Sequence, residues 1–365
     1  MNFKIAVLPG DGVGPEIVAE GLKVLQAVGK KFGHQFDLTY GLIGGVAIDK
    51  QGTALSQDTV DICKKSDAVL HGAVGDPRWD KQPDAKVRPE DGLLAIRKGL
   101  GLFANLRPVF MYPMLVDTPN LKPDVVRGVD FIVVRELTGG LYFGRPKKRW
   151  TTSRGRRAVD SMSYSEAEIV RIIKVGFELA RSRKKRLVSV DKANVLETSR
   201  LWRQIAMEIS KDYPDVSLEH MLVDSCSMRF IQNPRYFDVI VTENTFGDIL
   251  TDEASMLAGS MGMLPSASIA GVPKEGERIF GLYEPIHGSA PSHTGKNDIN
   301  PIATINSVAM LLRYSLGLEN EAKTVETSVE SVLKDGYRTY DIMSENMTRV
   351  GTREMGDVIV EKIFG

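Results

Sequence analysis

The chain has 365 residues, of which 42% are hydrophobic, so it can bury a large core and is predicted to form two packed lobes. Lysine and arginine number 47 and aspartate and glutamate also number 47, so no net charge draws the chain toward nucleic acid or an anionic membrane. No apolar run reaches the roughly 18 residues of a membrane span, no signal peptide is evident, and Cys63 and Cys226 fit a reducing compartment, so we expect a soluble, cytoplasmic protein.

Short β-branched runs alternate with amphipathic stretches along the chain. Strands are predicted at 5–8, 68–70, 131–134, 187–190, 216–223 and 238–241, and helices at 16–32, 92–102, 165–182 and 198–212. This alternation is typical of an α/β fold in which helices cover both faces of a mostly parallel sheet. The basic segment 145–157 departs from the pattern. We interpret it as a solvated arm or loop and not as a nucleic-acid contact, because no aromatic interleaving accompanies it.

The loop after the first predicted strand is rich in glycine but differs from a dinucleotide fingerprint. It reads Gly10-x-Gly12-x-Gly14 followed by Pro15, so the third glycine lies one place too early for G-x-G-x-x-G. No acid follows a second strand at the distance that a ribose contact requires. The pattern therefore argues against a standard Rossmann fold and favours a tight turn leading into a helix near a bound ligand.

Acidic residues follow two of the predicted strands. Asp248 and Asp252 are four residues apart, which places both carboxylates on one face of a helix. Such a pair is usually a solvated face, but here it lies just beyond a strand and is flanked by apolar residues. With Asp224 as a third oxygen donor, the set predicts a site for a hard ion, Mg²⁺ or Mn²⁺.

Three arginines are candidates for binding an anionic substrate: Arg97, Arg107 and Arg135. Glu90, Leu93, Leu94 and Arg97 follow the spacing i, i+3, i+4 and i+7, so one stripe of a helix would present two leucines between a carboxylate and a guanidinium. A core-facing helix with a terminal ion pair has the same pattern. A dicarboxylate with a branched alkyl group would use the whole stripe.

Two further residues have side chains suited to proton transfer. Lys192 lies just past a predicted strand, next to Asp191, and a lysine that is partly desolvated near a cation can act as a base. Tyr142 lies in a glycine-flanked segment, where a tyrosine can act as an acid. Each residue alone is more often structural, but together with a metal site and three arginines they indicate an enzyme.

Five segments resemble, in order, motifs of the β-decarboxylating dehydrogenases, the family of isocitrate and isopropylmalate dehydrogenases: 8–16 (LPGDGVGPE), 135–144 (RELTGGLYFG), 191–196 (DKANVL), 244–252 (NTFGDILTD) and 287–291 (HGSAP). The resemblance covers essentially the whole chain. It implies the two-domain fold of this family, with 1–102 plus 259–365 as the cofactor-side domain and 103–258 as the domain that carries the metal site, the dimer interface and the arm. It also implies a homodimer in which Lys192 and Asp224 reach into the neighbour's site.

The segment 88–98 resembles the substrate helix of the isopropylmalate branch of this family, where Leu93 and Leu94, together with Val195, contact an isopropyl group. Isocitrate enzymes place polar residues there. The resemblance therefore implies a metal-dependent oxidative decarboxylation of 3-isopropylmalate to 2-oxoisocaproate in leucine biosynthesis, with Asp224 near the substrate as well as the metal. Homoisocitrate, isocitrate, malate and tartrate remain alternative substrates. A metal-dependent lyase without nicotinamide remains an alternative of another class.

The resemblance also implies a nicotinamide cofactor between 73–90 and 288–300. The implied cofactor-binding residues are Val13, Ala73, Gly75, Glu90, Glu284, His287, Gly288, Ser289, Ala290, Ser292, His293, Asn300 and Tyr340. The isopropylmalate branch usually continues the HGSAP motif with Asp-Ile, and that aspartate binds the ribose hydroxyls of NAD. This chain has Ser292 and His293 instead, and it has Ile299 and Tyr340 where NADP-using relatives often have a valine and a tyrosine. NAD is the predicted cofactor, and NADP stays open.

Overall fold

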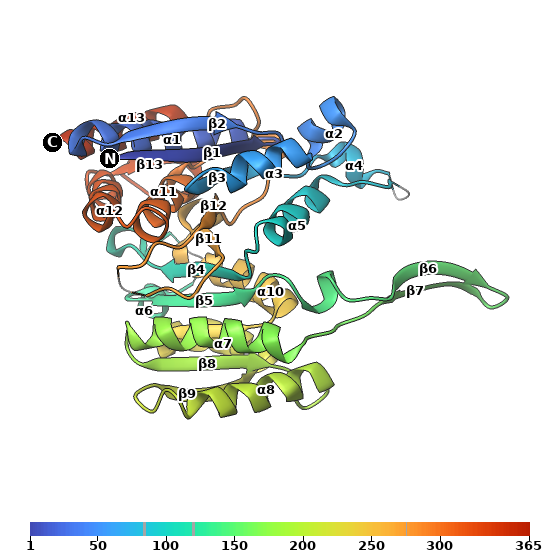
Figure 1. Cartoon of the computed structure of the whole chain (residues 1–365). Coiled ribbons are helices and arrows are strands. Elements are labelled where there is room, and N and C mark those ends of the chain that lie inside the picture. Colours follow the sequence, from blue (N-terminus) through green and yellow to red (C-terminus); the bar gives the residue numbers. More distant parts are fainter. Residues whose placement is uncertain (83–84, 119–120, 275) are drawn as a thin grey trace.

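A computed structural model describes residues 1–82, 85–118, 121–274 and 276–365 (Figure 1). Within these residues one ten-stranded sheet runs through the molecule in the order β2-β1-β3-β12-β11-β4-β5-β10-β8-β9. Its strands are β1 (Asn2–Gly10), β2 (Gln35–Tyr40), β3 (Ala68–Ala73), β4 (Ala104–Phe110), β5 (Asp130–Glu136), β8 (Arg186–Asp191), β9 (Ser217–Leu222), β10 (Val239–Thr242), β11 (Pro265–Ile269) and β12 (Gly281–Pro285). The six predicted strands are all present, which confirms the predicted α/β class.

The sheet is mostly parallel, with an antiparallel centre. β11 runs antiparallel to β12 and β4, and β4 runs antiparallel to β5, whereas the other neighbouring strands are parallel. The sequence pattern predicts β5 but not β4, β11 or β12. β11 is fully buried although it carries Ser266 and Ser268, and the Asn105 amide of β4 donates to both hydroxyls, at 2.7 and 3.2 Å. These bonds satisfy the buried polar groups of the two strands.

The longer helices pack beside the two halves of the sheet (Figure 1). Those near β1 and β12 are α1 (Gly14–Phe32), α11 (Ile302–Tyr314), α12 (Glu319–Lys334) and α13 (Thr352–Phe364), and those near β8 and β10 are α7 (Glu166–Arg181), α8 (Glu197–Ser210), α9 (Val223–Gln232) and α10 (Asn244–Ser255). The remaining helices are α2 (Gly45–Gln51), α3 (Gln57–Lys64), α4 (Pro77–Asp80), α5 (Pro89–Gly99) and α6 (Pro123–Val126). Among the described residues, no helix combines the length and apolarity that crossing a membrane requires.

The four predicted helices are present with small shifts at their ends, and capping explains two of the ends. α1 stops at Gly33, which adopts the left-handed conformation that glycine tolerates, with φ of +73°. α7 starts after Ser165, whose hydroxyl accepts a hydrogen bond from the backbone N–H of Glu168 while the Glu168 carboxylate binds the Ser165 N–H. Val223, predicted to end a strand, begins α9 instead.

The basic segment 145–157 forms most of an extended hairpin, as the arm interpretation predicted. β6 (Lys147–Thr152) and β7 (Gly155–Asp160) pair antiparallel and project away from the body (Figure 1). Almost all of their residues are exposed. An isolated two-stranded ribbon is only marginally stable in water. A second short sheet joins β13 (Tyr337–Arg338) to β14 (Thr348–Arg349).

Candidate active site

A cavity of about 370 Å³ lies beside α5, between the ends of several strands and the start of α10. Its volume is in the range of small-molecule sites. The predicted site residues that line it are Ala73, Glu90, Leu93, Leu94, Arg97, Arg107, Arg135, Tyr142, Asp248, Glu284, His287 and Gly288. The structure therefore brings together the three arginines, the tyrosine, one of the acids and the whole helix stripe. Lys147 of the arm and His71 of β3 also line it, and the sequence pattern assigns neither of them a role.

The stripe on α5 faces the cavity in the predicted register. Leu93 and Leu94 are half-buried, and Glu90 at the start of the helix is exposed. Arg97 is 5% exposed, and its Nη2 donates to Glu284 Oε1 at 2.8 Å. The arginine is thus held by a buried carboxylate from β12 while its side chain still borders the cavity, so the stripe is more than a core-facing surface.

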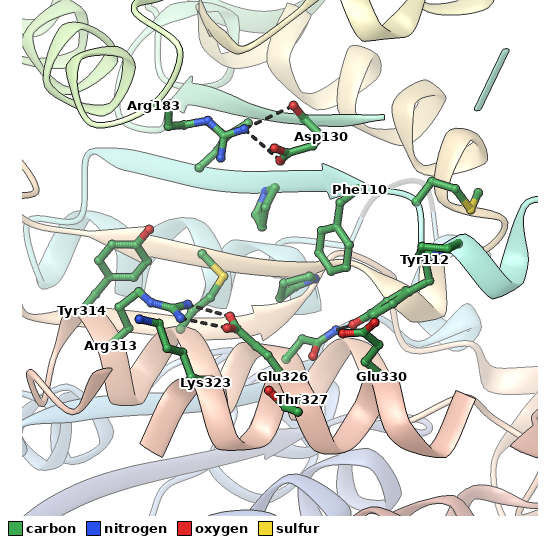
Figure 2. Close-up of a pocket in the computed structure, with 17 residues that line it drawn as sticks. Phe110, Tyr112, Asp130, Arg183, Arg313, Tyr314, Lys323, Glu326, Thr327 and Glu330 are labelled. Atoms are coloured by element: carbon green, nitrogen blue, oxygen red, sulfur yellow. Dashed lines mark hydrogen bonds and ion pairs between the residues drawn. The ribbon is translucent and has the colours of Figure 1, made fainter. Parts of the chain in front are cut away.

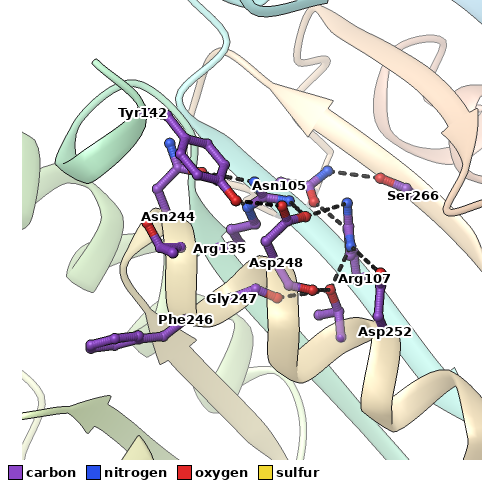
Figure 3. A network of polar contacts seen from close by, with 12 residues as sticks. Asn105, Arg107, Arg135, Tyr142, Asn244, Phe246, Gly247, Asp248, Asp252 and Ser266 are labelled. Atoms are coloured by element: carbon purple, nitrogen blue, oxygen red, sulfur yellow. Dashed lines mark hydrogen bonds and ion pairs between the residues drawn. The ribbon is translucent and has the colours of Figure 1, made fainter. Parts of the chain in front are cut away.

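Two buried amides orient the other two arginines (Figure 3). Arg107 Nε donates to Asn105 Oδ1 at 2.7 Å, and Arg135 donates to Asn244 Oδ1 from Nε at 3.1 Å and from Nη2 at 2.8 Å. The sequence analysis missed both amides. Asn105 lies two residues before Arg107 in a strand, and this spacing places the two side chains on one face and could have indicated the contact.

Asp248 is the meeting point of the charged groups in this cavity (Figure 3). Its Oδ1 forms an ion pair with Arg135 Nη1 and lies 3.8 Å from Arg107 Nη2, and its Oδ2 accepts a hydrogen bond from the Tyr142 hydroxyl at 2.8 Å. Burial alone would raise the pKa of Asp248, but the two guanidinium groups outweigh it and the pKa lies below its usual value. Burial and the neighbouring Asp248 carboxylate raise the pKa of Tyr142 to about 12, so its phenol keeps its proton at neutral pH.

Asp252 lies one helical turn beyond Asp248, with its side chain 58% exposed and its Oδ1 3.8 Å from Arg107 Nη1. Burial, with the like charge of Asp248, raises the pKa of Asp252. Two acids that repel in this way are hard oxygen donors that suit Mg²⁺ or Mn²⁺. Within the described part of one chain, no group of three side chains is arranged to hold a metal ion. The third predicted donor, Asp224, lies elsewhere.

Lys192, Asp224 and Val195 do not line the cavity of their own chain. Lys192 Nζ donates to Asp224 Oδ1 at 2.6 Å, and this ion pair lowers the pKa of the Asp224 carboxyl. Val195 is 61% exposed. The three predicted residues therefore stand in an exposed region beyond β8, and one chain does not bring them to the predicted substrate.

The glycine loop forms the tight turn that the sequence predicted. The Val13 N–H donates to the Ser289 carbonyl at 2.9 Å, which joins the loop to the segment 288–290. Gly12 has φ of +58°, and a Cβ there would lie 2.0 Å from the Ser289 carbonyl oxygen, so only glycine allows this approach. The Gly75 N–H donates to Asp11 Oδ2 at 3.0 Å, which brings the end of β3 into the same corner.

The remaining predicted cofactor residues lie farther along the same face. The rings of His293 and Tyr340 stack with centroids 5.2 Å apart, and His293 Nδ1 lies 3.0 Å from Asp298 Oδ1. Ser292 is exposed, Ala290 has a left-handed backbone, and Ile299 is buried. Asn300 Nδ2 donates to Asp341 Oδ2 at 3.1 Å. In the predicted cofactor segment 73–90, residues 83–84 lie outside the described residues.

A second cavity, of about 550 Å³, lies at the opposite end of β5, near Asp130 (Figure 2). Its arginines face carboxylates: Arg183 Nη2 donates to Asp130 at 2.8 Å, and Arg313 Nη1 donates to Glu326 at 2.7 Å. Among the described residues that line it, none belongs to the set that the sequence singled out. The candidate active site is therefore the first cavity.

Comparison with known proteins gives one consistent result. A family profile described as "Isocitrate/isopropylmalate dehydrogenase" matches residues 4–359. The chain is 66% identical over its full length to a 3-isopropylmalate dehydrogenase of Dehalococcoides mccartyi, and 57% identical over its full length to one of Carboxydothermus hydrogenoformans, covering 100% and 95% of those proteins.

Solved structures agree with this result. The chain is similar to an isocitrate dehydrogenase from Methylococcus capsulatus, with a TM-score of 0.87, 32% identity and complete coverage of both chains. It is also similar to a β-decarboxylating dehydrogenase from Thermococcus kodakarensis, with a TM-score of 0.78 and 31% identity, covering 99% of this chain and 96% of that one.

Proposed function

The chain belongs to the isocitrate/isopropylmalate dehydrogenase family, and from that premise we propose that it oxidises and decarboxylates 3-isopropylmalate in leucine biosynthesis. The observation that carries the proposal is the cavity wall on α5, where Leu93 and Leu94 border a space ringed by three arginines. The full-length relatives named 3-isopropylmalate dehydrogenase support the same substrate.

The cavity fits a substrate with two carboxylates and a branched alkyl group. Arg97, Arg107 and Arg135 can hold the carboxylates through paired donors, which fixes the orientation of the carbon to be oxidised. The two leucines offer an apolar wall to the alkyl group. A third carboxylate in its place, as in isocitrate, would lose its hydration against that wall without gaining a partner.

The donor set of α10 fits a divalent cation, with Asp248 and Asp252 supplying hard oxygen ligands and Asp224 of a second copy as the third. When bound, Mg²⁺ or Mn²⁺ polarises the oxygen on the carbon that is oxidised. The segments 73–90 and 288–300 would hold NAD, which would supply the hydride acceptor.

The remaining steps are proton transfers, which side chains of the protein itself carry out. Lys192 takes the proton of the substrate hydroxyl, directly or through water, as the hydride leaves. After loss of the carboxylate, Tyr142 returns a proton to the carbon. Its raised pKa, about 12, keeps the phenol protonated at neutral pH, as a proton donor must be. Its hydroxyl already donates toward the cavity acid Asp248, at 2.8 Å.

The division of the site between two copies is part of the proposal. Lys192, Asp224 and Val195 stand outside their own cavity, on a surface that a second copy can place against it. We retain the two domains, 1–102 with 259–365 and 103–258, as the units that flank the cavity. We also retain NAD as the cofactor. Ser292, which stands where relatives of this branch carry an aspartate, leaves NADP as the alternative.

A substrate panel tests the proposal. The acids 3-isopropylmalate, isocitrate, homoisocitrate, malate and tartrate are each assayed with NAD and with NADP, following the absorbance of reduced nicotinamide. We expect kcat/KM for 3-isopropylmalate to exceed that for isocitrate by at least about a hundredfold, because the third carboxylate of isocitrate would lie against the two leucines without a partner. Leu93→Ser combined with Leu94→Asn should lower this ratio of kcat/KM values. Ile249→Ser, at an exposed position on α10, is the matched control and should leave the ratio unchanged. Equal use of the two acids by the wild type would refute the assignment, and product without reduced nicotinamide would point to a lyase.

A further inference from the structure

His71 is a completely buried histidine in the wall of the candidate active site. It lies on β3 with no exposed surface and borders the cavity. Its Nδ1 is 2.8 Å from the carbonyl oxygen of Leu8 on β1. Because a carbonyl oxygen can only accept, Nδ1 carries a proton in this arrangement. The imidazole therefore has a fixed orientation and a fixed tautomer, and its second nitrogen, Nε2, faces away from Leu8.

Nε2 has no hydrogen-bond partner among the described residues, although it is buried. The nearest acid is Glu284 of β12, whose Oε2 lies 3.8 Å away. The other oxygen of the same carboxylate accepts the bond from Arg97 Nη2 at 2.8 Å. One buried carboxylate thus stands between the imidazole and a guanidinium that borders the substrate cavity.

The other charged groups that act on His71 come from two further elements. Arg97 of α5 disfavours a second proton on the ring, and Asp11, in the loop after β1, favours it. Burial is the largest influence and lowers the pKa of His71, so the ring is neutral at neutral pH in the absence of substrate. Burial would raise the pKa of Glu284, but Arg97 and His71 outweigh it and keep this carboxyl ionised.

The neutral form of the His71 ring is electrostatically unfavourable beside the Glu284 carboxylate. With the proton on Nδ1, Nε2 is an acceptor that lies 3.8 Å from an acceptor oxygen of the Glu284 carboxylate, and both groups are buried. A proton on Nε2 turns this pair into a charge-assisted hydrogen bond. Glu284 then divides its charge between His71 and Arg97, and the guanidinium is freer to bind an anion in the cavity.

We propose that His71 is a positioning residue for Arg97, that it acts through Glu284, and that dicarboxylate binding draws a proton onto its imidazole. The inference rests on the proposed function, since it takes Arg97 as a substrate ligand. Two negative charges beside Arg97 favour an additional positive charge nearby, so substrate binding raises the proton affinity of His71. By linkage, protonation of His71 raises the affinity for the substrate by the same factor.

The sign of the pH dependence follows from this linkage. The complex binds the proton more tightly than the free protein does, so the affinity for the dicarboxylate is highest below the pKa of free His71. It falls as the pH rises to the pKa of the complex and is constant above it. A histidine that is buried for packing alone, without coupling to Arg97, produces no such change in affinity across this pH interval.

Nuclear magnetic resonance of the histidine rings tests the geometry without turnover. The chain has five histidines, and His71→Asn identifies the signal, because an asparagine amide can still donate to the Leu8 carbonyl but cannot titrate. We expect free His71 to show the Nδ1–H tautomer with a pKa below the ordinary value of about 6.5. Saturation with 3-isopropylmalate and Mg²⁺ should raise this pKa by at least about half a unit. An Nε2–H tautomer, or a pKa that the acid does not move, would overturn the inference.

A second measurement uses the pH dependence of KM for the dicarboxylate, with kcat measured alongside. In the wild type KM should increase with pH between the pKa of free His71 and the pKa of the complex, by the factor that corresponds to the measured difference between these two pKa values, whereas His71→Asn should give a flat profile over the same interval. His220→Asn is the matched control, because His220 also has buried, unpartnered ring nitrogens but does not line the cavity. This variant should keep the wild-type profile.

The two possible failures are distinguishable. If another dicarboxylate of the panel proves to be the substrate, the proposed substrate is wrong. The tautomer of His71 and the linkage can then still be measured with that acid. If 3-isopropylmalate is the substrate and the KM profile of His71→Asn follows the wild type, the inference about His71 is wrong while the proposed function stands. If His71→Asn does not fold, Glu284→Gln serves in its place. Loss of that carboxylate must lower the pKa of His71, and an unchanged pKa would contradict the coupling.

Discussion

The division of the site between two copies can be tested by pairing two damaged chains. Tyr142 lines the cavity with Asp248, whereas Lys192 is bonded to Asp224 outside it. If a second copy supplies the lysine, then Tyr142→Phe and Lys192→Ala damage different halves of each site. The heterodimer of these two chains contains one site that carries both substitutions and one that carries neither.

The expected activity of the heterodimer follows from its number of intact sites. A proton-transfer residue contributes typically about 10² to 10⁴ in rate, so each parent homodimer should keep about 1% of wild-type kcat or less. The heterodimer has one intact site of two and should reach about half of the wild-type kcat per dimer, because the two interfaces of a twofold dimer are equivalent. The expected gain over either parent is therefore at least about fiftyfold.

The assay uses co-expression with two different affinity tags, tandem purification and turnover with saturating substrate and cofactor. The matched control pairs Tyr142→Phe with Arg107→Met, because both residues line the cavity of their own chain and every site of that heterodimer remains damaged. Two tagged wild-type chains fix the upper limit. If the Tyr142 and Lys192 heterodimer stays at the level of its parents while the wild-type pair is fully active, Lys192 does not act across the interface.

Three further predictions concern single steps and properties. Tyr142→Phe should slow release of the decarboxylated product more than formation of reduced nicotinamide in a single turnover; equal slowing of both would remove the tyrosine from the proton-return step. Ser292→Asp with His293→Ile should raise the ratio of kcat/KM for NAD to that for NADP at least about tenfold, some 1.4 kcal/mol, because the new acid repels the 2′-phosphate of NADP. An unchanged ratio would mean that the adenosine ribose does not lie beside these two residues. Burial raises the pKa of Cys63 to about 12 and also raises the pKa of Cys226, so both thiols stay protonated at pH 8. A thiol reagent at pH 8 should therefore modify them only after denaturation, and fast labelling of the native protein would contradict their burial.

Much of the cavity could be predicted because residues just past the ends of neighbouring strands gather at one edge of the sheet. Arg135 lies near the end of a strand that was evident from its β-branched run, and ligands bind beyond the carboxyl ends of such strands. The stripe from Glu90 to Arg97 was also predictable, since helical spacing alone places these residues on one face. Local periodicity was sufficient in both cases, and no contact between distant residues had to be known.

The antiparallel centre and the amides that hold the arginines could not be predicted in the same way. Asn105 and Ser266 are 161 residues apart, and the hydrogen bond between them helps to offset the cost of burying both side chains. A polar residue taken alone predicts exposure, so the sequence pattern did not indicate these strands. His71 is the first residue after a predicted strand, and nothing local distinguishes a histidine in the wall of the site from one in a solvent-facing loop.

Asp248 balances the positive charge of two of the arginines in the cavity. Its two oxygens are shared by Arg135 and Tyr142, with Arg107 3.8 Å away, so the carboxylate occupies the donors that a dicarboxylate would otherwise bind. A divalent cation that engages this carboxylate competes with the guanidinium and the phenol for the same oxygens. The donors it displaces then face the cavity, where the substrate carboxylates are the available acceptors. Under the proposed function, cation and substrate would therefore favour each other's binding through this one aspartate, which belongs to the same network as the arginines of β4 and β5.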